Sequence, residues 1–132
     1  MQFEYYVESS KKNELIDIRG VLEDALKKSG VKEGLLNVYA AHATAAIIIN
    51  ENYDPNICLD FLDALNNIIP EGKWRHDQVD NNAAAHIKSA IVGPSETIPI
   101  KDGKLQLGTW QSPMLCDFDG PRKRKIIITL LK

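Results

Sequence analysis

The chain has 132 residues, of which 44% are hydrophobic and 26% charged, a composition that suits one folded domain over residues 1–132. Its formal net charge of −2 argues against a nucleic-acid binder, because such proteins cluster Lys and Arg against phosphates. No apolar run is long enough to cross a membrane, and the first residues lack the pattern of a signal peptide. We therefore expect a cytoplasmic protein that binds neither nucleic acid nor membrane.

The densest basic run extends from Arg122 to Lys125. We interpret it as a solvated turn beside a strand, with a site for a small anionic ligand as the alternative. Cys58 and Cys116 have no CxxC spacing, and we interpret them as buried thiols.

The first third of the chain alternates between strand and helix patterns. Polar and apolar residues alternate over 2–8, which predicts a strand. After Asp17, apolar residues recur at three and four positions up to Gly30, which predicts a capped helix. Two apolar runs, 34–41 and 45–49, then predict either one bent strand or a tight pair, with His42 at the break.

The middle of the chain is predicted to be helical. Asp54 and Pro55 start a helix that Pro70 and Gly72 end. Residues 73–79 show no period and are predicted to be a loop, and a second helix over 81–90 follows Asp80.

Four strands are predicted in the last third, over 97–100, 104–107, 111–118 and 124–131. Asp102 and Gly103 between the first two indicate a hairpin. This order of elements is typical of an α+β domain with an antiparallel sheet or sandwich. The sequence contains no internal repeat and no phosphate-binding loop motif.

All three histidines, His42, His76 and His86, lie in the middle of the chain on three different predicted elements. Three imidazoles with one open position are typical of a catalytic zinc site, although each histidine alone also fits an ordinary core or surface role. Glu51 ends a predicted strand, where it is either a general base or an exposed charge.

Three further residues are candidates for contacts with a substrate. Asn82 and the start of the second predicted helix offer amides to a phosphate, or simply cap the helix. Trp110 follows a glycine and is either a stacking platform for a flat ring or a core residue, and Gln111 adds an amide beside it.

Taken together, the motifs resemble those of the YjbQ-like family, whose members are described as secondary thiamine-phosphate synthases. The matching elements cover essentially the whole chain and are His42-Ala43-Thr44-Ala45-Ala46, Asn50-Glu51, His76-Asp77, Ala85-His86-Ile87-Lys88, Gly93-Pro94-Ser95, Asp102-Gly103 and Leu107-Gly108-Thr109-Trp110-Gln111. The resemblance implies a mainly antiparallel β-sandwich with flanking helices, assembled as a homotrimer.

The resemblance also assigns roles to these residues. It marks the three histidines as the site, Glu51 as its acid, and Trp110 with Gln111 as a signature near it. The family usually has two hydroxyl residues after the first histidine, whereas here Ala43 replaces one and Thr44 remains as the candidate catalytic hydroxyl.

The implied reaction joins hydroxymethylpyrimidine diphosphate to thiazole phosphate. The expected cofactor is a divalent metal ion on the histidines, with zinc first and manganese, iron, nickel or magnesium as further candidates. We expect the metal, Lys88 and the helix start to neutralise the departing diphosphate, and Trp110 to stack on the pyrimidine. Because imidazoles are not the usual ligands of magnesium, a metal-dependent hydrolase is an alternative, as is a trimeric protein that binds a small ligand or metal without turnover.

Overall fold

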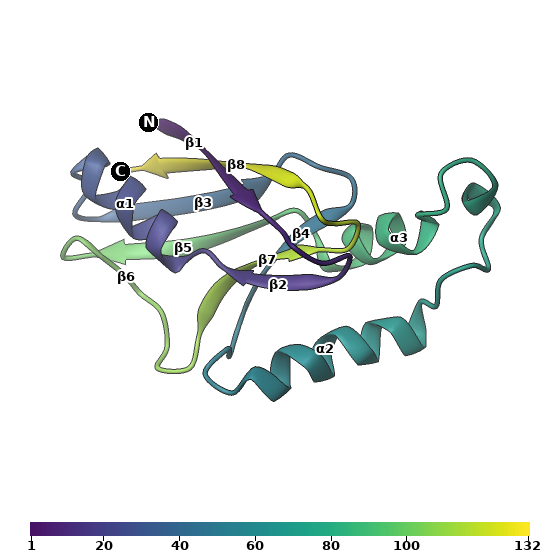
Figure 1. Cartoon of the computed structure of the whole chain (residues 1–132). Helices are drawn as coiled ribbons and strands as arrows, with labels where there is room; N and C mark the ends of the chain where they lie inside the picture. Colours follow the sequence, from purple (N-terminus) through teal and green to yellow (C-terminus); the bar gives the residue numbers. More distant parts are fainter.

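The computed structural model describes residues 1–132 and contains two antiparallel sheets with three α-helices around them (Figure 1). The larger sheet has the strand order β1 (Gln2–Glu8), β8 (Lys123–Leu131), β3 (Gly34–Ala40), β5 (Ser95–Lys101) and β6 (Lys104–Leu105). The smaller sheet has the order β2 (Glu14–Asp17), β7 (Ser112–Asp117) and β4 (Ala45–Asn50). The expected α+β class, with antiparallel sheets and flanking helices, is confirmed.

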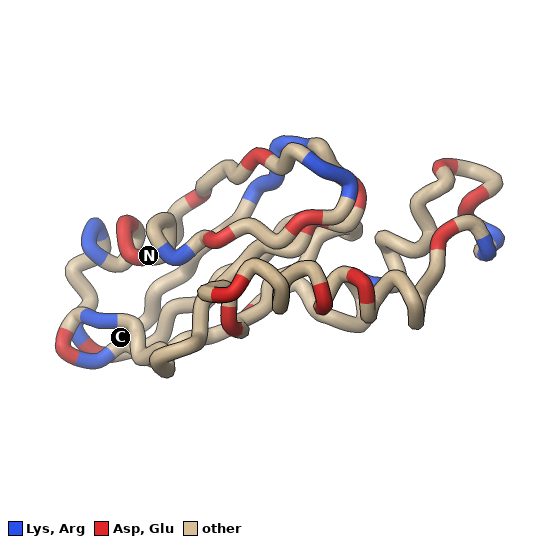
Figure 2. Tube along the Cα trace, turned by 60° about the horizontal axis from the view of Figure 1, so that its bottom comes forward, with Lys and Arg blue, Asp and Glu red and all other residues tan.

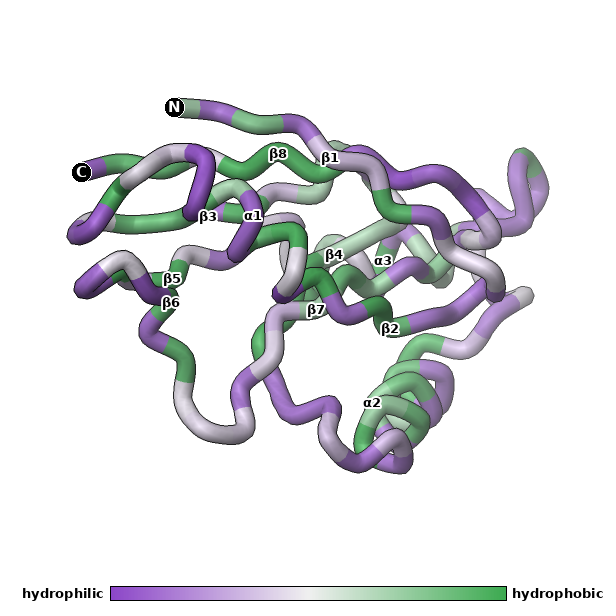
Figure 3. The backbone as a smooth tube through the Cα atoms, turned by 60° about the vertical axis from the view of Figure 1, so that its left-hand side comes forward, coloured by the Kyte–Doolittle hydropathy of each residue, from purple (hydrophilic) through white to green (hydrophobic).

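The main core lies where the two sheets and the first helix meet. Its 16 buried residues come from both sheets, from α1 (Arg19–Ser29) and from the residues next to that helix. Figure 3 shows long apolar stretches on β8, β3, β4 and β7. Burial of alternate residues on β3 and β8 gives each strand one face toward this core.

Both ends of α1 follow the sequence signals. The Asp17 carboxylate accepts a hydrogen bond from the Arg19 amide at 2.8 Å, and Gly30 closes the helix with a φ of 69°. Such a positive φ suits glycine, which has no Cβ to clash. The short strand β2 was not predicted, because its two apolar residues, Leu15 and Ile16, are too few to show an alternating pattern between the polar stretch and Asp17.

The two apolar runs on either side of His42 form neither one bent strand nor a tight pair. β3 belongs to the larger sheet and β4 to the smaller, so residues 41–44 cross from one sheet to the other. The strands β7 and β8 are likewise in different sheets, joined by residues 118–122. The chain therefore crosses between the two sheets at residues 41–44 and again at 118–122, and His42 lies on the first crossing.

The predicted hairpin at Asp102 and Gly103 is confirmed. Lys101 pairs with Lys104, and the two turn residues have φ values of 53° and 70°. Positive φ at both positions is the geometry of the tight turn that matches the twist of antiparallel strands.

The remaining helices lie between β4 and β5 in the chain. α2 (Pro55–Ile68) starts where Asp54 accepts a hydrogen bond from the Asn56 amide, and it has no buried residue. It lies apart from the larger sheet (Figure 1), and it carries acidic side chains and no Lys or Arg (Figure 2). A short 3₁₀ helix, η1 (Arg75–Gln78), and α3 (Ala83–Val92) follow. None of the helices is both long and apolar enough to cross a membrane.

Candidate functional site

Two of the three histidines line one pocket. His42 comes from the β3–β4 crossing and His86 from α3, and the pocket has a volume of about 310 Å³. Its other lining residues are small or apolar apart from one serine: Ala43, Ala45, Ser89, Ala90 and Pro94. We call this the histidine pocket.

His76 lies on the other side of His86. It belongs to η1, and its ring is edge-on to the His86 ring with 5.0 Å between the ring centroids. Both rings line a second hollow of about 250 Å³ together with Trp74. His86 therefore lies between His42 and His76, as the one imidazole shared by both hollows.

His42 is fixed by a contact with the main chain. The backbone N–H of Lys125, in β8, donates a hydrogen bond to His42 Nε2 at 2.6 Å. Burial and the nearby Arg124 guanidinium lower the pKa of His42, which favours its neutral form. A neutral ring that accepts at Nε2 carries its proton on Nδ1.

A buried ion pair lies next to this histidine. Arg124 donates to both oxygens of Asp117, at 2.9 Å from Nε and 2.6 Å from Nη2, and both side chains are almost fully buried. Burial alone raises the pKa of Asp117, but hydrogen bonds from Arg124, Ser9 and the Asp119 amide outweigh it and lower the pKa. The basic run at 122–125 is therefore not simply a solvated turn, because one of its members is a core residue.

Thr44 contacts this ion pair and is absent from the residues that line the histidine pocket. Its hydroxyl accepts a hydrogen bond from Arg124 Nη2 at 2.9 Å, and the residue is buried. The hydrogen bond with Arg124 therefore explains why a hydroxyl is buried at this position. The structure thus does not place Thr44 where a catalytic hydroxyl would meet a substrate in the pocket.

The start of α3 is already occupied by acidic side chains of the chain. Asp77 accepts a hydrogen bond from the Ala83 amide at 3.0 Å, and Asn82 donates to Asp119 at 2.9 Å. Hydrogen bonds from the Trp74 and Ala83 amides lower the pKa of Asp77, so it is a carboxylate at neutral pH. This helix start therefore offers little to a phosphate, contrary to the expectation for Asn82.

Lys88 is fully buried instead of facing a ligand. Its Nζ donates to Asn66 of α2 at 2.5 Å and lies 3.5 Å from the Asn13 side-chain oxygen. It also lies 5.7 Å from the centroid of the Phe118 ring. The expected contact of Lys88 with diphosphate does not fit this position, because the ammonium has internal partners and no access to solvent.

Glu51, Trp110 and Gln111 lie at the opposite end of the smaller sheet. In the β4–β7 pairing, Ala45 is opposite Asp117 and Asn50 is opposite Ser112. The histidine end and the Glu51 end are thus separated by the length of β4, about 20 Å at 3.3 Å per residue.

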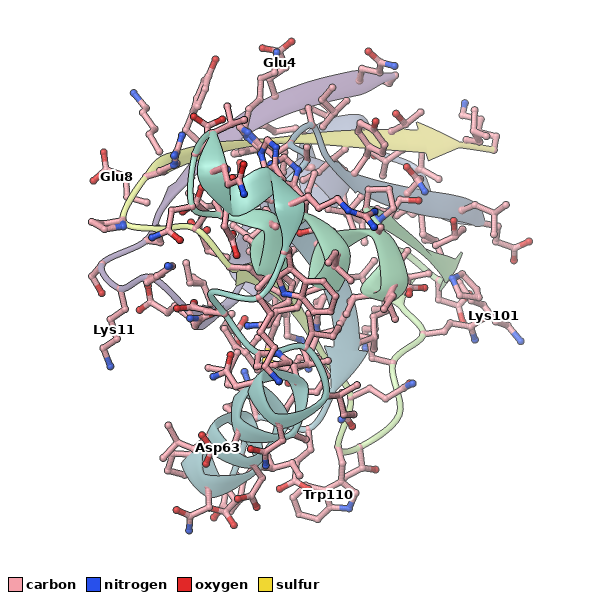
Figure 4. The ribbon with its side chains drawn as sticks, turned by 90° about the vertical axis from the view of Figure 1, so that its right-hand side faces the viewer. Glu4, Glu8, Lys11, Asp63, Lys101 and Trp110 are labelled. Carbon is pink, nitrogen blue, oxygen red and sulfur yellow. The ribbon has the colours of Figure 1, made fainter.

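The Trp110 side chain is exposed and points outward at the foot of the molecule, well away from α3 (Figure 4). It makes an edge contact with Tyr53, with 5.7 Å between ring centroids. Gln111 accepts a hydrogen bond from the Gly108 amide at 2.8 Å. Trp110 is therefore not a core residue, and one chain alone does not bring this loop to the histidines.

The three histidines of one chain do not form a metal site by themselves. No group of three or more His, Cys, Asp or Glu side chains is arranged to hold a metal ion. The lone pair of His42 Nε2 already accepts a hydrogen bond from the Lys125 amide, and in the neutral ring the other nitrogen carries the proton. His76 and His86 are then the two imidazoles that remain, and a metal bound to them requires ligands from elsewhere.

Sequence reasoning missed Asp117 and Arg124, which position His42. Both residues lie on predicted strands, and the alternating pattern of the second strand indicates which of its residues face inward. Arg124 is in register with the inward-facing Ile126, Ile128 and Leu130. Two opposite charges at inward positions on strands joined by one short turn indicate a buried ion pair.

A family model described as UPF0047 protein YjbQ-like matches residues 3–132. The chain belongs to this family. A UPF0047 protein of Methanocaldococcus jannaschii is 43% identical over 99% of this chain and 94% of its own length, and YugU of Bacillus subtilis is 38% identical over 95% of each.

Solved structures of relatives have the same fold. A YjbQ/UPF0047 protein from Clostridium acetobutylicum, described as uncharacterized, has a TM-score of 0.94 and 41% identity over 98% of this chain and 99% of its own. A protein of unknown function from Sulfolobus solfataricus has a TM-score of 0.95 and 34% identity over 98% and 95% of the two chains. These relatives establish the family and the fold, and their names state no reaction.

Proposed function

We propose that this protein is an enzyme that acts on a small phosphorylated substrate in the histidine pocket. The observation that carries the proposal is the convergence of His42 and His86, from two separate elements, on one pocket. Imidazoles are suited to proton transfer and hydrogen bonding near neutral pH. Arg122 and Lys125 also lower the pKa of His42, but neither lines the pocket, and they are paired with Asp119 and Glu4.

The family resemblance favours thiamine-phosphate synthesis as the reaction. The thiazole nitrogen attacks the methylene carbon of hydroxymethylpyrimidine diphosphate, the carbon–oxygen bond breaks, and diphosphate leaves with the bonding electrons. Such a step needs positive charge and hydrogen-bond donors at the leaving group. Partners within the chain already engage Lys88, Asn82, Arg122 and Lys125. We therefore assign this task to the two imidazoles that line the pocket, His42 and His86.

Glu51, Trp110 and Gln111 enter this proposal through a second protomer. They lie at the far end of the smaller sheet, so they reach a histidine pocket only if another chain presents them. The homotrimer that the resemblance implies provides such a neighbour. Sedimentation of the 14.8 kDa chain at a mass of three copies is the expected result, and a monomer would remove these three residues from the site.

A divalent metal ion, with zinc as the first candidate, stays a prediction. His76 and His86 supply two imidazoles, and a metal ion there needs water, substrate or a second protomer to complete its ligands. Elemental analysis of protein purified without chelators tests this. We expect about one metal ion per chain, reduced in His86→Ala.

One observation favours hydrolysis as a second candidate. The groups expected to neutralise a diphosphate, Lys88 and the start of α3, are occupied within the chain. Hydrolysis of a phosphate ester needs a general base for the attacking water, which an imidazole of the pocket can supply, and it has no diphosphate leaving group to neutralise. A hydrolase acting in the histidine pocket is therefore the alternative to the transferase.

Incubation of the purified protein with both thiamine precursors and zinc or magnesium separates these candidates. We expect thiamine phosphate from the wild-type protein and from Lys101→Ala, an exposed change on the distant hairpin, and none from His86→Ala. Product formation that His86→Ala leaves unchanged would contradict the transferase site. Release of inorganic phosphate from one precursor alone would support the hydrolase, and binding without turnover would support a ligand-binding protein.

A further inference from the structure

The hydrogen bond to His42 Nε2 determines what this ring can offer to a ligand. A backbone N–H can donate only to a nitrogen that has a free lone pair, so Nε2 carries no proton. The proton of the neutral ring is then on Nδ1. His42 presents a hydrogen-bond donor, and its one lone pair is already used by Lys125.

The ring is held in this orientation by the buried ion pair described above. Lys125, which donates to the ring, directly follows Arg124, and Thr44, which accepts from Arg124, lies two residues after His42. The Asp117 carboxylate fixes the guanidinium with two hydrogen bonds. One charged pair thereby anchors both the donor strand and the loop that carries the imidazole.

His42 Nδ1 has no partner inside the chain. It makes no hydrogen bond to protein, and it is not among the buried polar atoms that lack one, so it is open to solvent. The residue lines the histidine pocket together with His86. A donor that is fixed in direction and open to a pocket is already in place for an acceptor on a ligand.

We infer that His42 binds a phosphate oxygen of the substrate through Nδ1–H, and that Asp117 and Arg124 are the positioning residues that aim it. His42 is then not a metal ligand, and any metal ion in this region binds His76 and His86. The inference rests on the proposed function, because it assigns one residue of the same pocket. It concerns the state of the ring before any turnover.

The tautomer of His42 can be measured without activity. In long-range ¹H–¹⁵N spectra of the selectively labelled protein, we expect the His42 signals to show protonated Nδ1 and unprotonated Nε2 at neutral pH. His42→Gln assigns the signals by their loss. A His42 ring with the proton on Nε2 overturns the inference, whatever the reaction of the enzyme is.

A matched set of variants tests the donor role with inorganic phosphate as the probe. Asparagine can place a side-chain N–H near the position of Nδ1, whereas alanine cannot. We expect His42→Ala to weaken phosphate binding, measured by NMR titration, by about tenfold, and His42→Asn to stay within about threefold of the wild type. Equal losses in the two variants, or no loss in either, would contradict the inference.

Zinc titration separates this role from metal binding. We expect His76→Ala and His86→Ala to lower zinc affinity by at least about tenfold, and His42→Ala to leave it within about twofold. If His42→Ala loses zinc as strongly as His86→Ala, His42 is a ligand and the inference fails. If the wild-type protein binds no zinc, the tautomer measurement and the phosphate titration still decide whether His42 is a donor.

Discussion

Individual residues hold the loop 41–44, which carries His42, in place. The most important of them are Asp117 and Arg124. Two charges without access to water are stable together because the bidentate contact and the bonds from Ser9 and to Thr44 use their polar atoms. Loss of one partner leaves the other buried and unpaired. The pair therefore specifies the geometry of the loop more than it adds to stability.

Substitution of one partner gives a large and specific loss of stability. We expect Arg124→Met to lower the free energy of unfolding by about 3–5 kcal/mol, because Asp117 then remains as an unpaired buried charge. The double variant Arg124→Met/Asp117→Leu should recover part of that loss. Urea unfolding measures both, and the exposed neighbour Lys123→Met, expected within about 0.5 kcal/mol of wild type, is the control. Equal effects of the Arg124 and Lys123 changes would contradict the account.

At the scale of elements, local signals predicted the positions of most helices and strands. The Asp17 and Gly30 ends of α1, the Asp54 start of α2 and the Asp102–Gly103 turn all act within a few residues. Sheet membership was not predictable in the same way. Assignment of β3 and β4 to different sheets depends on pairings with β8 and β7, far away in sequence.

Contacts between distant segments also explain why the candidate site was only partly predictable. Three histidines on three elements were visible in the sequence, and the structure brings His42 and His86 to one pocket and His76 to the other side of His86. Lys88 reads as a surface lysine after a histidine, and only the packing of α2 against α3 shows that it is buried. Helical spacing alone could not predict this, because the partners of Lys88, Asn66 and Asn13, lie on other segments of the chain.

Lys88 connects α3 to α2, and its burial has a cost. Burial lowers the pKa of Lys88, so the unfolded chain binds the proton more tightly, and stability rises as pH increases through the lowered pKa toward 10.5. We expect Lys88→Met to raise the free energy of unfolding at pH 7 by about 1 kcal/mol, since Asn66 is exposed and can bind water instead.

Chemical denaturation of Lys88→Met beside Lys73→Met, an exposed lysine between the same two helices, measures this difference. A loss of more than about 1 kcal/mol in the Lys88 variant alone would show that its hydrogen bonds to α2 outweigh the cost of burying its charge.

For the whole molecule, the lowered pKa values of His42 and Asp117 predict sensitivity to acid. Both groups bind protons more weakly in the folded chain, so stability is full above the unfolded pKa and falls as pH decreases. We expect one loss below about pH 6.5 from His42 and a second below about pH 4 from Asp117.

Urea midpoints measured between pH 8 and pH 3 test both steps. His42→Gln keeps an acceptor for the Lys125 amide but cannot titrate, so it should remove the upper step and keep the lower one. An upper step that survives in His42→Gln would assign it to another group.

The crossing of the chain between the two sheets also sets when the pocket can form during folding. The Lys125 amide contacts His42 only after β8 has paired with β3. On its other edge β8 pairs with β1, where Gln2 lies opposite Thr129 (Figure 1). Contacts that join such distant parts of a chain form slowly, after local helices and hairpins. The Lys125 amide should therefore exchange its hydrogen with solvent only when the whole domain unfolds, and a partly folded chain with all its helices would still have no binding pocket.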